Sequence, residues 1–300
     1  MNPMDRSRIT LFFLLMALGT SAQLERPNAS PYTLEGTYEK LVKQYPMVRR
    51  ISEHGSKGIT KSEELIYHKV DSLDLKADVY NPEEKGKLFP GILLVHGGGW
   101  ISGSKDNLRP MAQQLAQKGF LAMTVNYRLA DKAKYPAALE DLHAAIAFLM
   151  ESDLPLDGNK IAILGASAGA QLASLAGQLN KDIKAVVNVD GIVSFVHPEA
   201  REGTYAAYWL GGTRSEKPQL WKAASPLEHI HSESPPILFI NSSQPRFHAG
   251  RDDMIKKLGE WGIYTEVFVH PDSPHSFWLV EPWFGPTLDQ TVEFLQKVLQ

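Results

Sequence analysis

The chain has 300 residues, of which 43% are hydrophobic and 22% are charged, with a formal net charge of −3 and no cysteine. This composition is typical of a globular protein and excludes disordered, collagen-like and coiled-coil chains. The slightly acidic charge does not support nucleic-acid binding, which normally needs a basic surface. The lack of cysteine excludes disulfides, thiolate metal sites and cysteine nucleophiles, whereas ten histidines remain for acid–base chemistry.

The N-terminus has the features of a secretory signal peptide. Arg6 and Arg8 precede an apolar run at 9–18, and small residues follow it up to Ala22. The run is shorter than the roughly 20 residues of a transmembrane helix, although a membrane anchor is the alternative. We predict a signal peptide at 1–22, export to the periplasm or the medium, and no stable membrane insertion after cleavage. Residues 23–60 are mixed and polar and are predicted to form an N-terminal arm.

After this arm, segments typical of strands alternate with segments typical of helices. We predict strands at 64–70, 74–80, 91–95, 120–127, 160–164, 184–189, 236–241 and 264–270, and helices at 34–45, 107–118, 136–150, 170–179 and 288–299. This alternation predicts an α/β fold for residues 61–300, with a mostly parallel central sheet covered by helices on both faces. Residues 192–232 have no clear strand and are rich in glycine, proline and tryptophan, which indicates a small inserted cap.

A serine stands at the turn between a predicted buried strand and the following helix, in Gly165-Ala-Ser-Ala-Gly169. This is the context that a Gly-x-Ser-x-Gly nucleophile elbow requires, because the sharp turn needs small flanking residues. The hydroxyl of Ser167 would then stand at a helix N-terminus, where negative charge is stabilised. The alternative is a tight strand–helix turn with an incidental serine.

A glycine-rich segment, His96-Gly-Gly-Gly-Trp100, follows the strand at 91–95. Attack of a serine on an ester creates an oxyanion that needs preorganised hydrogen-bond donors. We expect the amides of Gly98, Gly99 and Ala168 to supply them, with a plain glycine-rich turn as the alternative. His96 is expected to brace this loop rather than act as a base.

The general base is expected late in the chain, because this type of site orders its residues as serine, acid and histidine. His275 lies on the short loop after the last predicted strand and is therefore our candidate. His270 ends that strand and is expected to be packed or hydrogen-bonded. His248 is the main competitor.

The acid partner of the histidine is ambiguous. After the strand at 236–241, the usual position of the acid holds Ser243 or Gln244, and neither can be an anion. Asp190 at the end of the preceding strand is our first candidate, and Asp252 is the second, although Asp252 also fits a helix cap. Asp253 and Asp272 remain further alternatives.

Substrate contacts are predicted from one basic loop and from aromatic residues. Arg246, His248 and Arg251 lie in that loop, and an arginine there would bind a substrate carboxylate through two hydrogen bonds. Pairing of these arginines with Asp252 and Asp253 is the alternative. Trp100 and the cap tryptophan Trp209 are expected to face a sugar ring, and the alternative for the cap aromatics, Tyr205, Tyr208, Trp209 and Trp221, is packing of the cap.

Together these motifs resemble the α/β-hydrolase superfamily, in the branch of feruloyl and acetyl-xylan esterases and hormone-sensitive-lipase-like enzymes. The resemblance covers roughly residues 60–300 and is carried by His96–Trp100 with Ser102-Gly103, Asn126–Leu129, Tyr135–Ala138 with Asp141, and Gly165–Gly169. The stretch Pro245–Asp252, with Asp190-Gly191 and His197-Pro-Glu199, further resembles secreted bacterial esterases linked to pectin degradation.

The resemblance implies that Ser167 is the nucleophile and His275 the base. It predicts a secreted serine ester hydrolase that removes acetyl, methyl or feruloyl esters from plant polysaccharide such as pectin or xylan. An exopeptidase or amidase of the same fold, and a catalytically dead sugar-binding scaffold, are the alternatives. We expect no metal, no cofactor and no nucleic-acid partner.

Overall fold

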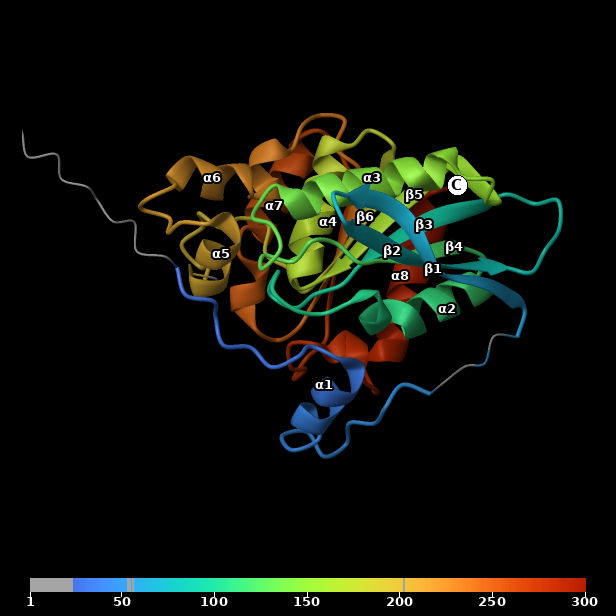
Figure 1. The fold of residues 1–300 in the computed structure, drawn as a ribbon, viewed down its shortest axis with the longest axis horizontal. Coiled ribbons are helices and arrows are strands. Elements are labelled where there is room, and N and C mark those ends of the chain that lie inside the picture. The colour runs from blue at the N-terminus through green and yellow to red at the C-terminus, as the bar shows by residue number, and fades with distance from the viewer. Residues whose placement is uncertain (1–23, 53–54, 56, 202) are drawn as a thin grey trace, which may run out of the picture.

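The computed structural model describes residues 24–52, 55, 57–201 and 203–300. In this part of the chain, one mixed sheet has eight strands in the order β1-β2-β4-β3-β5-β6-β7-β8. The sheet runs through the molecule between the helices (Figure 1). Its strands are β1 (Ile59–Val70), β2 (Leu73–Pro82), β3 (Phe89–Val95), β4 (Leu121–Val125), β5 (Leu156–Ala166), β6 (Ile183–Val189), β7 (Ile237–Asn241) and β8 (Thr265–Val269). The predicted signal peptide at 1–22 lies outside the described residues.

Antiparallel pairing is confined to one edge of the sheet. β1 pairs with β2, and β2 with β4, in antiparallel register. All other neighbours, from β4 to β8, are parallel. The parallel strands are therefore joined by helices, and their carboxyl ends share one edge of the sheet, where α/β folds place their sites. The predicted α/β-hydrolase fold with a mostly parallel sheet is confirmed.

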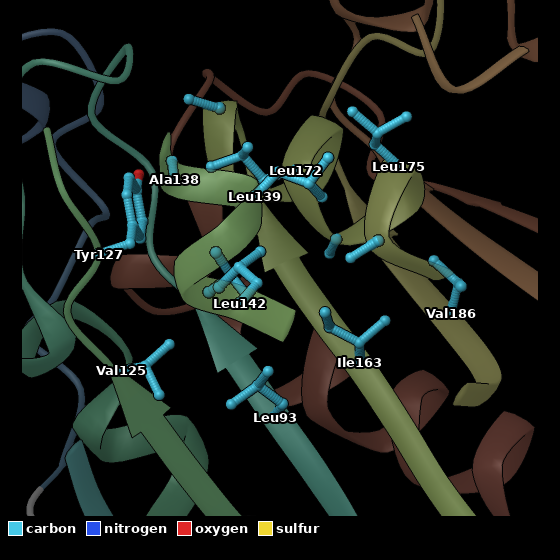
Figure 2. Packing of buried hydrophobic residues seen from close by; sticks show 14 of the residues in the cluster. Leu93, Val125, Tyr127, Ala138, Leu139, Leu142, Ile163, Leu172, Leu175 and Val186 are labelled. Carbon is cyan, nitrogen blue, oxygen red and sulfur yellow. The ribbon is translucent and has the colours of Figure 1, made fainter. Parts of the chain in front are cut away.

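Helices cover both faces of the sheet. α3 (Ala137–Glu151), α4 (Ala168–Leu179) and α7 (Arg251–Glu260) contribute to one buried cluster, and α2 (Arg109–Gln117) and α8 (Phe284–Val298) contribute to the other. Figure 2 shows the first cluster, in which Leu142 of α3 and Leu172 of α4 pack over Leu93 and Ile163 of the sheet. The neighbouring residues Leu94 and Leu164 belong to the opposite cluster. The central strands are thus buried on both sides, which explains their continuous apolar sequences.

Some boundaries differ from the sequence prediction. α8 begins at Phe284, four residues before the predicted start. Pro286 is accommodated in the first helical turn, because an N–H at that position would have no hydrogen-bond partner within the helix. α4 begins at Ala168, directly after the serine turn. The predicted cap at 192–232 contains α5 (Gly203–Leu210), α6 (Pro218–Ala223) and the 3-10 turn η2 (Pro226–His229), and no strand among its described residues.

The N-terminal arm packs onto the body instead of extending from it. Its helix α1 (Leu34–Leu41) buries Leu41 in the same cluster as α8. Further along, Arg49 and Glu281 exchange backbone hydrogen bonds of 3.1 and 3.0 Å. In Figure 1 the blue arm accordingly lies beside a red segment near the C-terminus. Among the described residues, no helix is long and apolar enough to cross a membrane.

Candidate active site

Ser167 occupies a strained turn between β5 and α4. Its backbone has φ 54° and ψ −121°, a conformation that costs energy for a residue with a side chain. The turn is tight enough that a Cβ on Gly165 would meet the carbonyl oxygen of Gly169 at 2.0 Å, and one on Gly169 would meet that of Val95 at 2.1 Å. Only glycine fits at these two positions, which is why the sequence pattern flanks the serine with glycines. The serine hydroxyl is thereby presented at the start of α4.

His275 connects this serine to Asp190. Its Nε2 lies 2.9 Å from Ser167 Oγ, and its Nδ1 lies 2.6 Å from Asp190 Oδ2. Because an ionised carboxylate only accepts hydrogen bonds, the ring proton belongs on Nδ1, and Nε2 accepts from the serine hydroxyl. The imidazole is therefore oriented to take the serine proton. The three side chains form the hydrogen-bonded series that acyl-transfer chemistry uses.

Asp190 is fully buried at the end of β6. Burial alone would raise the pKa of its carboxyl group, but contacts with His248, His275 and the Ser242 amide outweigh this effect and hold the pKa below its usual range. The Ser242 amide donates to Oδ1 at 2.9 Å. The carboxylate is thus kept ionised in the interior by the groups around it.

The other acid candidates do not meet His275. The Asp252 side chain is 82% exposed and accepts a 2.8 Å hydrogen bond from Arg251 in the first turn of α7. Asp253 lies next to it and faces His197 at 3.6 Å. Asp272 has φ 56° in the loop before His275 and has no ion pair with a described residue. The structure therefore brings Asp190, the first candidate of the sequence analysis, to the histidine.

The glycine-rich loop after β3 stands opposite the serine. Gly98 has φ 120°, and a Cβ there would meet the Ser102 carbonyl oxygen at 2.1 Å. Among the described residues, the amides of Gly98, Gly99 and Ala168 donate to no backbone carbonyl, and all three residues line the cavity that contains Ser167 and His275. These amides are available as oxyanion donors.

The side chain of His96 stabilises this loop. Its buried ring stacks on Tyr127 with centroids 4.4 Å apart, and its Nδ1 lies 2.7 Å from the Gly97 carbonyl oxygen. Burial lowers the pKa of His96 to about 4, so the ring is neutral at pH 7. His270 is likewise packed, with Nε2 2.9 Å from Thr287 Oγ1.

The cavity at the serine measures about 600 Å³ and is enclosed partly by the N-terminal arm. Asn28–Tyr32 and α1 residues line one side, and the glycine loop and the His275 loop line the others. Its charged lining is mostly basic, with Lys40, Arg201 and Arg246. No described acid lies within ion-pair distance of these three side chains.

The region that holds these residues matches a known family. The family model BD-FAE aligns with residues 77–247, more than half of the chain. The chain belongs to the BD-FAE family. The matched region of this BD-FAE protein includes the glycine loop, Ser167 and Asp190, whereas His275 and the N-terminal arm lie outside it.

Curated relatives share part of their length with this BD-FAE protein. Esterase LipQ of Mycobacterium tuberculosis is 27% identical over 222 residues, which is 64% of this chain and 51% of LipQ. Carboxylesterase NlhH of the same species is 34% identical over 113 residues, which is 37% of this chain and 35% of NlhH. The chain thus spans about half the length of LipQ and about a third of NlhH.

Solved structures share the fold over nearly their whole length. Thermogutta terrifontis esterase 2, phosphonylated by sarin, has a TM-score of 0.68 at 22% identity and covers 81% of this chain and 96% of its own. A truncated carbohydrate esterase from gut microbiota has a TM-score of 0.68 at 20% identity and covers 83% and 99%. At these identities the likeness establishes the α/β-hydrolase fold.

Several predicted substrate contacts lie elsewhere in this BD-FAE protein. Trp100 and Arg246 line the cavity. Trp209 does not, because its fully buried ring stacks on Trp100 with centroids 4.9 Å apart. Arg251 also lies away from the cavity, since its guanidinium donates to Asn241 and Asp252 at 2.8 Å. These two expectations are therefore corrected, each in favour of the packing or pairing alternative.

His248 is a further correction. It does not line the cavity, and its Nε2 lies 3.6 Å from Asp190 Oδ1. His248 belongs to the 3-10 turn η3 (Pro245–His248). Phe247 of the same turn stacks on the ring of His275 with centroids 3.6 Å apart. This turn therefore supplies a neighbour to Asp190 and a neighbour to His275.

Sequence reasoning did not single out Phe247 or the arm residue Tyr32. The Tyr32 hydroxyl donates to Ser276 Oγ at 3.1 Å, next to the base. Phe247 lies in the stretch Pro245–Asp252 that carries the resemblance, but no pattern assigned a role to it or to Tyr32, because both reach the site through tertiary packing. No group of three or more His, Asp or Glu residues suited to a metal ion occurs among the described residues.

Proposed function

We propose that this chain is a serine carboxylic-ester hydrolase. The observation that carries the proposal is the hydrogen-bonded series from Ser167 Oγ through His275 to Asp190, with distances of 2.9 and 2.6 Å. Gly98, Gly99 and Ala168, whose amides donate to no backbone carbonyl of the described residues, line the same cavity. A nucleophile, an oriented base and oxyanion donors are the three parts that ester cleavage requires.

In the proposed reaction, Ser167 Oγ attacks the ester carbonyl while His275 Nε2 takes the serine proton. The carbonyl oxygen becomes an oxyanion that the three amides stabilise, and the low pKa of Asp190 keeps a negative charge beside the imidazolium. The tetrahedral intermediate then collapses, and the leaving alcohol receives the proton from His275. Water, activated by the same histidine, releases the acid from the acyl-enzyme and restores the serine.

We propose carbohydrate esters as the substrates, with acetyl, methyl or feruloyl groups on plant polysaccharide such as pectin or xylan. The 600 Å³ cavity, lined by Trp100 and Tyr205 and by three cationic side chains, supports a bulky and partly polar substrate. The structural neighbour from gut microbiota is a carbohydrate esterase. Export through the signal at 1–22 would place the enzyme where such polymers occur. The alternative of a dead binding scaffold was suggested by a missing acid, and the 2.6 Å contact of Asp190 with His275 removes that reason.

The test is product release from pectin and xylan by the purified chain. Acetate, methanol and ferulate are measured in parallel, together with hydrolysis of p-nitrophenyl acetate. We expect Ser167→Ala to lower ester hydrolysis by about 10³-fold or more, and a fluorophosphonate probe to label the wild-type chain but not this variant. Equal hydrolysis by Ser167→Ala would contradict the mechanism. Cleavage of aminoacyl anilides in preference to esters would show a peptidase instead.

A further inference from the structure

The 3-10 turn η3 (Pro245–His248), between β7 and α7, has one residue next to His275 and one next to Asp190. Phe247 lies parallel to the His275 ring, at 3.6 Å between centroids and an interplanar angle of 12°. The next residue, His248, places Nε2 at 3.6 Å from Asp190 Oδ1. This turn follows β7, in the segment where this type of site usually holds its acid.

His248 Nε2 is buried and has no hydrogen-bond partner among the described residues. A buried polar nitrogen without a partner costs free energy comparable to a lost hydrogen bond. The side chain of His248 is only 14% exposed, and the ionised carboxylate of Asp190 is a compensating group 3.6 Å from Nε2. The separation is longer than a hydrogen bond, and catalytic contacts of this kind often tighten when substrate binds.

The two oxygens of Asp190 have separate partners. Oδ2 accepts from His275 Nδ1, whereas Oδ1 accepts from the Ser242 amide and faces His248. A carboxylate held on both oxygens cannot rotate away from the base. Rotation would lengthen the bond that selects the productive tautomer of His275.

We propose that His248 is a positioning residue, whose Nε2–H holds Oδ1 of Asp190 so that Oδ2 stays directed at His275. The inference rests on the proposed function, because it concerns the orientation of the acid in that reaction. It assigns His248 a role through Asp190 instead of a contact with substrate. The competing explanation is that the ring only fills space at the end of η3.

Two substitutions separate these explanations. His248→Phe keeps a ring of similar shape but removes the donor, whereas His248→Gln keeps an N–H at a similar reach and removes the ring. If His248 positions Asp190, we expect His248→Phe to lower kcat for p-nitrophenyl acetate about tenfold, the equivalent of about 1.4 kcal/mol, with KM unchanged. His248→Gln should stay within about threefold of wild type.

The matched control is His229→Phe, since His229 is half-buried in η2, bonds the Ala223 carbonyl oxygen and does not line the cavity. Thermal unfolding of every variant tests whether it is folded, and His248→Leu replaces His248→Phe if the latter does not fold. A double-mutant cycle adds the stricter test. In an Asp190→Asn background, His248→Phe should cause no further loss, because there is then no carboxylate to hold.

Wild-type kcat in His248→Phe, or an equal loss in His248→Gln, would overturn the inference in favour of packing. A full additional loss in the Asp190→Asn background would overturn it as well. If wild type and Ser167→Ala hydrolyse the ester equally, the proposed function itself is contradicted. This comparison does not involve His248, so it distinguishes that failure from a failure of the His248 inference.

Discussion

Asp190 and His275 are 85 positions apart in the chain, and their side chains meet at 2.6 Å. The contact follows from the order of the strands, because Asp190 directly follows β6 and the loop that carries His275 follows β8, with β7 between them. The carboxyl ends of these parallel strands lie at one edge of the sheet. The Asp190 amide also donates to Ile240 of β7 at 2.8 Å, which fixes the acid to the neighbouring strand. An acid directly after β6 is therefore within hydrogen-bond distance of a histidine in the loop after β8.

The first prediction separates the two leading acid candidates. Asp190→Asn should lower kcat by about 10³- to 10⁴-fold, because an amide cannot stabilise the imidazolium and favours the wrong tautomer of His275. Asp252→Asn should stay within about twofold, since that side chain is exposed and, among the described residues, forms its ion pair with Arg251. Steady-state hydrolysis of p-nitrophenyl acetate measures both. The reverse order of effects would identify Asp252 as the acid.

The sequence was sufficient for the fold and for two of the three catalytic candidates. Strands buried on both faces must be apolar throughout, so their runs were visible, and Ser167 and His275 stand at turns whose positions follow from those strands. The choice between Asp190 and Asp252 was not decidable, because both follow strands in the chain. It depends on a distance across the sheet that no local pattern contains.

The substrate contacts were less predictable for the same physical reason. Whether an arginine faces a cavity or an acid is decided by side-chain packing, and Arg251 bonds Asn241 and Asp252. Trp209 shows the same limit, since a large aromatic ring suits a sugar and a core equally well. No pattern in the arm sequence predicted that the arm would line the cavity, because Asn28–Tyr32 reach the cavity only after the arm packs against the body.

The second prediction concerns Gly98. Gly98→Ala should abolish most activity and lower the free energy of unfolding by about 1–3 kcal/mol, because φ is 120° and a Cβ would collide with the Ser102 carbonyl oxygen. Gly259→Ala is the matched control, since that glycine lies in α7 and a Cβ there meets no atom within 4 Å. Urea unfolding and ester hydrolysis are measured together. Unchanged activity in Gly98→Ala would show that this loop does not hold the oxyanion.

The third prediction tests the arm as a wall of the substrate site. The arm is fixed by Arg26, which bonds Asp131 at 2.7 Å, and by Tyr32, which donates to Ser276. Ala29→Phe adds a ring to the cavity lining, so it should lower kcat/KM for large esters more than for p-nitrophenyl acetate, by about tenfold or more in the ratio. Series that vary the acyl group and the alcohol group are both measured.

The control for this prediction adds the same ring outside the cavity. Glu39→Phe places it on an exposed position of α1 that does not line the site. It should leave the size preference of the enzyme unchanged. An equal size preference in wild type and Ala29→Phe, for both series, would show that the arm does not limit the substrate.

The last prediction links His96 to acid stability. Burial lowers the pKa of His96 from its ordinary 6.5 to about 4, so between these values the unfolded chain binds a proton that the folded chain excludes. Stability therefore falls as the pH drops from 6.5 towards 4, by about 3 kcal/mol from this residue. The depressed pKa of Asp190 acts in the same direction at lower pH, below its usual 3.8.

Urea unfolding at pH 7 and pH 4.5 measures the loss. His96→Asn should make this dependence shallower, because an amide can still donate to the Gly97 carbonyl oxygen but does not titrate. The part that comes from His270, whose pKa burial also lowers to about 4, should remain. His68→Asn on the exposed side of β1 should leave the dependence unchanged. A pH dependence in His96→Asn as steep as in wild type would show that another group causes the acid sensitivity.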